Sequence, residues 1–73
     1  MDDDLSVPIA AVATSIKVAQ REIEVVLDRM EKRYEGRGNP YEWPDYNAAF
    51  ALRAYLRDAA EMSDRLKKLE GCR

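Results

Sequence analysis

The sequence contains no histidine, a single cysteine, three glycines and three prolines in 73 residues. Without histidine the chain lacks the commonest general base, the commonest zinc ligand and the usual pH switch. Cys72 cannot form an internal disulfide, and it is predicted to be a free thiol in a reducing compartment. No apolar run approaches the roughly 18 residues that a membrane span requires. These absences predict a protein with no metal site, no cofactor and no membrane segment.

The residue patterns of known catalytic sites are missing as well. The stretch GRGN has neither the spacing of a phosphate-binding loop nor the strand that precedes one. Two carboxylates act as acid and base only where one of them is desolvated. The acids of the first half of the chain are instead predicted to form a solvated face: Glu22, Glu24, Asp28, Glu31 and Glu35. The sequence therefore predicts a protein that is not an enzyme.

The charges are mixed and nearly balanced, with 12 basic and 14 acidic residues and a formal net charge of −2. The first residues, MDDDL, lack the basic segment and apolar run of a signal peptide, so we expect a cytoplasmic location. Basic side chains alternate with acids along residues 17–37, and these acids would repel phosphate. Nucleic acid is therefore not the favoured partner.

Two long stretches carry apolar residues at alternating steps of four and three, the spacing of a helix with a coiled-coil seam. The first consists of Leu5, Ile9, Val12, Ile16, Ala19, Ile23, Val26 and Met30, and the second of Ala48, Leu52, Tyr55, Ala59, Met62, Leu66 and Leu69. Ser6 is a predicted N-cap of the first helix, and Gly36 follows its end. Either Pro44 or Asp45 opens the second helix.

This pattern predicts an all-α fold, an antiparallel two-helix hairpin of coiled-coil type, in one domain covering residues 1–73. The helices are expected over about 7–35 and 45–70, joined by a loop over 36–44. The sequence does not tell which of two similar seams faces inward on each helix.

The beginning of the first helix is apolar on most faces, since Lys17 is the one charged residue between Pro8 and Ala19. One neighbouring helix cannot cover so much apolar surface, and surplus apolar surface usually marks an interface. We therefore expect a partner chain to complete the hairpin. The partner is expected to be another protein in a hetero-oligomer, although a homodimer stays open. The predicted partner-binding residues on this helix are Ile9, Val12, Ile16, Ala19 and Ile23.

Aromatic residues gather in the predicted loop, which holds Tyr41 and Trp43, and Tyr46 follows shortly after it. Asn39 to Glu42 has the pattern of a capped single helical turn. The aromatic rings could close the end of the hairpin over its core. They could also form a binding hot spot, because Trp and Tyr dominate interface energetics. Tyr41 and Trp43 are therefore included among the predicted partner-binding residues.

The stretch LDRMEKRYEG, a proline-containing loop and then PDYNAAFALRAYLRDAAEMSDRL resembles the small cytoplasmic co-chaperones of type III secretion needle proteins, the E component. The likeness covers residues 25–66, and the aromatic loop is longer than in that family. The resemblance implies a heterodimer with a larger TPR-like chaperone. The two proteins together would keep the needle subunit soluble before export. The residues that match the family pattern are Pro44, Tyr46, Leu52, Leu56 and Ala59.

Two other interpretations remain open from the residues alone. The chain could be a structural or regulatory homodimer that forms a four-helix bundle, with or without RNA binding. It could also be an inhibitor that covers a site on another protein. All three interpretations describe a non-enzymatic protein–protein interaction module.

Overall fold

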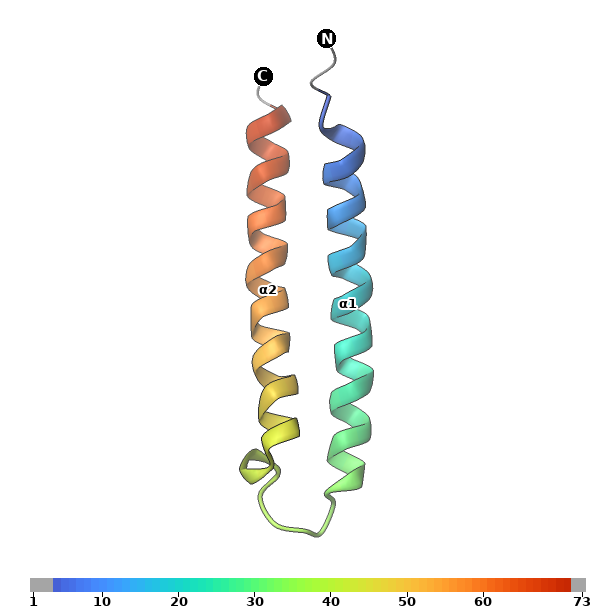
Figure 1. Cartoon of the computed structure of the whole chain (residues 1–73), viewed down its shortest axis with the longest axis vertical. Helices are drawn as coiled ribbons and strands as arrows, with labels where there is room; N and C mark the ends of the chain where they lie inside the picture. The colour runs from blue at the N-terminus through green and yellow to red at the C-terminus, as the bar shows by residue number, and fades with distance from the viewer. Residues whose placement is uncertain (1–3, 72–73) are drawn as a thin grey trace.

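The structure is a computed structural model, which describes residues 4–71. It contains two long helices, α1 (Ser6–Arg33) and α2 (Pro44–Gly71), and a short 3-10 helix, η1 (Pro40–Glu42), between them. Helices α1 and α2 lie side by side and run in opposite directions, with the connection at one end (Figure 1). The hairpin measures 58 × 14 × 14 Å. This arrangement confirms the predicted all-α antiparallel hairpin.

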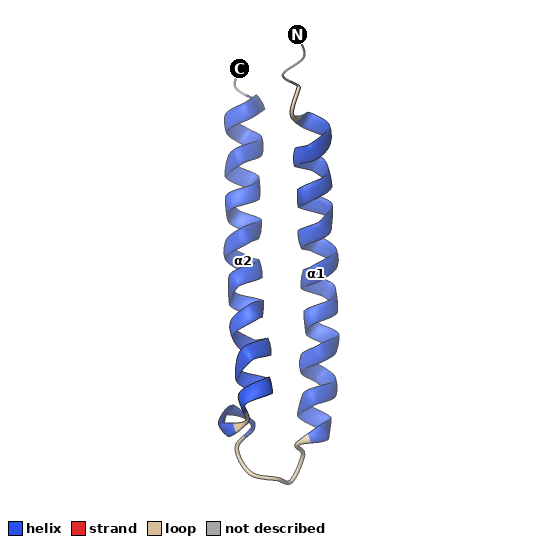
Figure 2. Cartoon of the chain, in the orientation of Figure 1, coloured by secondary structure: helices blue, strands red, loops and turns tan. Residues whose placement is uncertain are grey.

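The helix boundaries differ slightly from the predicted ones. Helix α1 begins one residue earlier than expected and ends at Arg33 rather than near residue 35. Helix α2 begins at Pro44, so this proline is the first helical residue, and Asp45 is already inside the first turn. Figure 2 shows how little of the described chain lies outside helices. Cys72 lies outside the described residues.

Asp4, rather than the predicted Ser6, stabilises the start of α1. The backbone N–H of Ser6 donates a hydrogen bond of 2.9 Å to the Oδ1 atom of Asp4, and Leu5 occupies the N-cap position. This bond from Ser6 lowers the pKa of the Asp4 carboxyl. A carboxylate at this place also interacts favourably with the positive end of the helix dipole.

The connection between the helices turns at two glycines and then forms η1. Gly36 and Gly38 have φ angles of 75° and 94°, a left-handed region that glycine adopts without steric cost. Asn39 caps η1, because its side-chain oxygen accepts a hydrogen bond of 3.0 Å from the backbone N–H of Tyr41. This confirms the single helical turn that the sequence predicts.

The core lies mainly in the half of the hairpin that is closer to the connection. It consists of Ile23 and Leu27 from α1 and Tyr46 and Ala49 from α2. Partly buried residues pack against this cluster: Met30, Tyr34, Trp43 and Leu56. Leu27 is the most buried of the core residues, with 3% of its surface exposed. Towards the open end of the hairpin, Ile9 is the buried apolar residue of α1.

The sequence left open which seam of α2 faces α1, and the structure shows that it is not the apolar stripe from Ala48 to Leu69. Every large residue of that stripe is exposed, namely Leu52, Tyr55, Met62, Leu66 and Leu69. The residues that are buried or half-buried against α1 follow a second series with the same steps: Tyr46, Ala49, Arg53, Leu56, Ala60 and Ser63. Small side chains in this inner series let the two helices approach each other. Apart from Leu56, the large aliphatic side chains of α2 therefore point away from α1.

Candidate functional site: an apolar face along the hairpin

One side of the hairpin carries two rows of apolar residues, one from each helix. Residues seven positions apart lie almost on the same face of a helix, because seven residues make nearly two turns. The row on α1 consists of Leu5, Val12, Ala19 and Val26, and the row on α2 consists of Leu52, Ala59 and Leu66. We call these two rows, with Tyr55, Met62 and Leu69 beside them on α2, the apolar face.

Contacts at both ends show that the two rows lie on the same side of the hairpin. Near the connection, Nη1 of Arg33 lies 3.5 Å from Oδ2 of Asp45. Seven-residue steps away from this ion pair lead along α1 to Val12 and along α2 to Leu66. Near the open end, these two residues line the same groove, together with Leu5 and Pro8. The rows therefore run in register along the hairpin.

The side chains of the apolar face are well exposed for apolar groups. Val12 has 52% of its surface exposed, Leu66 44% and Tyr55 69%. Ala19 and Ala59 are half-buried in the middle of the two rows. The apolar face thus has small side chains at the middle of its length and larger side chains towards both ends of the hairpin. Contiguous exposed apolar side chains of this kind commonly mark an interaction surface.

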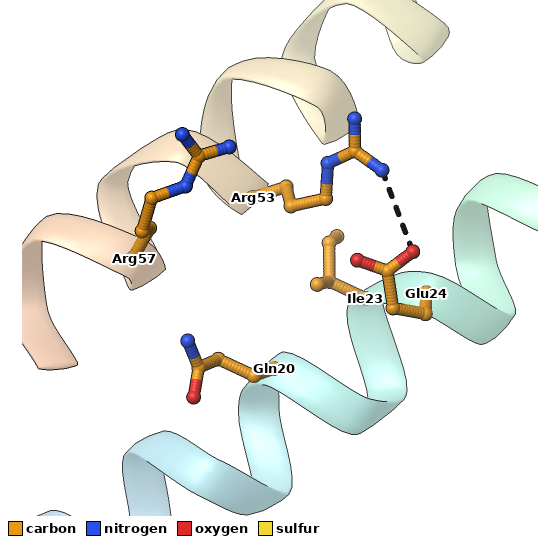
Figure 3. Close-up of a pocket in the computed structure, with 5 residues that line it drawn as sticks. All are labelled: Gln20, Ile23, Glu24, Arg53 and Arg57. Atoms are coloured by element: carbon orange, nitrogen blue, oxygen red, sulfur yellow. Dashed lines mark hydrogen bonds and ion pairs between the residues drawn. The ribbon is translucent and has the colours of Figure 1, made fainter.

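The opposite side of the hairpin is charged, and we call it the charged face. Here Gln20 and Glu24 project from α1, and Arg53 and Arg57 project from α2, around a shallow cleft (Figure 3). Nη1 of Arg53 lies 3.4 Å from Oε1 of Glu24, and its guanidinium lies 4.8 Å from the centre of the Phe50 ring. The two-helix hairpin is therefore amphipathic, and its charged face is exposed to water.

The aromatic residues of the connection pack on the closed end of the hairpin. The rings of Tyr34 and Trp43 are stacked, with centroids 4.6 Å apart and planes at 4°. Tyr41 makes edge contacts with the rings of Tyr46 and Phe50, at 5.5 and 5.6 Å. These contacts support the interpretation that the aromatic residues close the end of the core. Tyr41 remains half-exposed, whereas Trp43 is partly buried.

A polar cluster fixes α1 to the start of α2. The hydroxyl of Tyr34 donates a hydrogen bond to Oδ2 of Asp45, and this bond is the main reason why the pKa of Asp45 is lowered. The same bond raises the pKa of Tyr34, because loss of its proton would break the bond. Arg33 lowers the pKa of Asp45 further through its charge. Asp45 therefore favours its charged form in the folded hairpin.

The predicted partner-binding residues have different environments in the structure. Ile9 and Ile23 are buried, and Ile23 belongs to the core of the hairpin. Ile16 is half-buried and lines a groove on the charged side with Lys17 and Gln20. Val12 and Ala19 belong to the apolar face. Of the five predicted residues on α1, these two lie in the exposed rows.

The sequence prediction omitted the contribution of α2 to this surface. Leu52, Leu66 and their neighbours form an apolar stripe whose direction the sequence did not tell, and the structure exposes them. A signal was available in Tyr46, a residue that seldom remains exposed at the start of a helix beside other aromatic rings. Steps of three and four from Tyr46 lead to Ala49 and Arg53, which face α1.

Comparison with protein families, curated proteins and solved structures finds no match to this chain. Neither helix within residues 4–71 has an apolar stretch long enough to cross a bilayer. In the same range, no three or more Asp, Glu or Cys side chains gather in a way that could hold a metal ion.

Proposed function

We propose that the protein is a non-enzymatic interaction module that binds other helices through its apolar face. The observation that carries this proposal is the orientation of α2, which presents most of its large aliphatic residues outward and packs several small residues against α1. Exposing Leu52, Met62 and Leu66 to water is unfavourable, at about 25 cal/mol for each Å² of apolar surface. A helical partner that covers the face would remove this cost.

The resemblance to type III needle co-chaperones supplies a narrower form of the proposal. In that form, the partner is a larger TPR-like chaperone, and the two proteins keep a needle subunit soluble in the cytoplasm. Three features of the hairpin support it: its length, the proline that opens α2, and an apolar face that extends along both helices. The concave surface of a TPR-like protein is itself built from helices and suits such a ligand.

The first experiment compares two glutamates placed on α1, two residues apart. Val12→Glu puts a charge on the apolar face, whereas Ala10→Glu is a matched control on the other side of Ile9, where Lys67 is near. The measurements are the solution mass by light scattering and the helicity by circular dichroism. Each chain is measured alone and mixed with a TPR-like chaperone of a type III secretion system.

We expect the wild-type chain to form an assembly, with itself or with the added chaperone. Val12→Glu should weaken that assembly at least tenfold, since a buried unpaired carboxylate is strongly unfavourable, and Ala10→Glu should change it less than twofold. A helical wild-type chain that stays at 8.4 kDa in both experiments would refute the proposed function. So would an assembly that Val12→Glu leaves unchanged.

A further inference from the structure

The chain exposes more surface than a compact folded protein of its mass. A compact monomer of 8.4 kDa is expected to expose about 4,600 Å², whereas this chain exposes 5974 Å². The excess is roughly 1,400 Å² per chain, so two chains would together bury about 2,700 Å² if they covered it. Obligate homodimers bury about 2,000–5,000 Å² in total. The excess area is therefore sufficient for a stable dimer.

We infer that the apolar face is covered by the same face of a second copy of this chain, giving a four-helix bundle whose two-fold axis runs along the hairpin. This inference rests on the proposed function and specifies its occupant. In this arrangement, α1 of one copy faces α2 of the other, and both connections lie at the same end. Neighbouring helices are antiparallel throughout, as in most small four-helix bundles.

The side chains along the two rows fit this rotation at three successive levels. Because the axis runs along the hairpin, each residue of the α1 row meets the α2 residue that lies at its own height. Val26 would meet Leu52 of the second copy, Ala19 would meet Ala59, and Val12 would meet Leu66. Large pairs thus lie on both sides of a small central pair, which allows the helices to approach closely at the middle.

The charges at the closed end also favour this axis. Arg33 and Asp45 continue the two rows, so Arg33 of one copy would lie beside Asp45 of the other and form a ring of four alternating charges. A two-fold axis across the hairpin would instead place Leu5 opposite this ion pair. Leu5 is apolar and would strip water from the two charges, which is unfavourable.

Residues beside the rows complete the fit. Pro8 and Glu22 flank the α1 row, and Leu69 and Tyr55 flank the α2 row. With the axis along the hairpin, Leu69 would pack on Pro8 of the second copy, and the hydroxyl of Tyr55 would lie near the carboxylate of Glu22. The charged face stays on the outside of the bundle, where Arg53, Arg57 and Glu24 remain in water.

Cysteine cross-linking in the full-length chain tests both the occupant and the axis. In a Cys72→Ser background, Ala19→Cys and Ala59→Cys are prepared as separate chains, mixed and oxidised with glutathione. We expect a covalent 19–59 dimer several-fold in excess over either symmetric dimer, and a native mass of twice 8.4 kDa. Ala10→Cys, mixed with Ala59→Cys, is the control and should give no 10–59 disulfide, because residue 10 lies off the apolar face.

Three results would overturn the inference. A dominant 19–19 or 59–59 disulfide would show that like helices face each other, and an assembly of another mass would exclude the two-fold bundle. A chain that stays monomeric alone, yet binds the TPR-like chaperone in a manner sensitive to Val12→Glu, would exclude the second copy as occupant. That last result would leave the proposed function intact, so the two failures can be told apart.

Discussion

Asp45 connects the ends of the two helices through single side-chain contacts. It accepts a hydrogen bond from Tyr34 on the far side of the connection, and the guanidinium of Arg33 lies 3.5 Å away. Its backbone lies in the first turn of α2, where a negative charge is favoured by the helix dipole. The charge of one carboxylate therefore contributes to the closure of the hairpin.

Asp45→Asn should make the stability of the hairpin less dependent on acid. The folded state lowers the pKa of Asp45 below its ordinary value of 3.8, so its contribution is present above that value and is lost as the pH falls through the lowered pKa. Thermal unfolding between pH 2 and pH 7 measures this difference. The melting temperature of the wild type should fall more steeply below about pH 4 than that of the variant. Parallel curves for the two proteins would contradict the assignment.

At the scale of the element, α2 is a helix with two seams, and its rotation decides what the protein exposes. The inner seam contains Ala49, Ala60 and Ser63, which bury little apolar area against α1. The outer seam holds most of the large aliphatic side chains. The stability of the isolated hairpin therefore depends mainly on the core near the connection, where Leu27 and Tyr46 are buried.

Leu27→Ala should lower the free energy of unfolding by about 2–4 kcal/mol, because it leaves a cavity in the most buried part of the core. Val25→Ala is the control, since Val25 is exposed on the outside of the same helix and its loss should cost less than about 0.5 kcal/mol. Urea unfolding followed by circular dichroism measures both. Equal effects of the two substitutions would show that the core does not lie where the structure places it.

The sequence predicted the helices and the hairpin because those depend on local spacing and on the residues of the connection. The spacing of apolar residues indicates the two helices, and Pro44 marks the start of α2. The residues after Asn39 indicate the short helical turn of the connection. The apolar spacing alone could not give the rotation of α2, since residues 46–63 and 48–69 offer two series with alternating steps of three and four. Packing against Leu27 and the aromatic rings selects the first series, and this choice depends on contacts distant in sequence. Two of the predicted partner-binding residues, Val12 and Ala19, lie on the apolar face. The part of this face that α2 contributes depends on the rotation of α2 and was therefore not predicted.

At the scale of the whole molecule, the proposed dimer would link stability to protein concentration. A protein stabilised by its own second copy unfolds at a temperature that rises with concentration, because dissociation and unfolding are linked by mass action. The melting temperature should therefore increase over a range from about 1 µM to 1 mM. Differential scanning calorimetry measures this shift. A melting temperature that stays constant over the whole range would indicate a hairpin that is stable alone.

The beginning of α1 and the end of α2 lie at the same extremity of the hairpin, far from the connection (Figure 1). With the two-fold axis along the hairpin, the first residues of both α1 helices and the last residues of both α2 helices would meet there, so Gly71 of one copy would lie near Ser6 of the other. A short linker could then join two copies into one continuous polypeptide with the same core. The opposite orientation would require a linker that runs the length of the 58 Å hairpin. Gene duplication and fusion thus have a direct route to a single-chain four-helix protein.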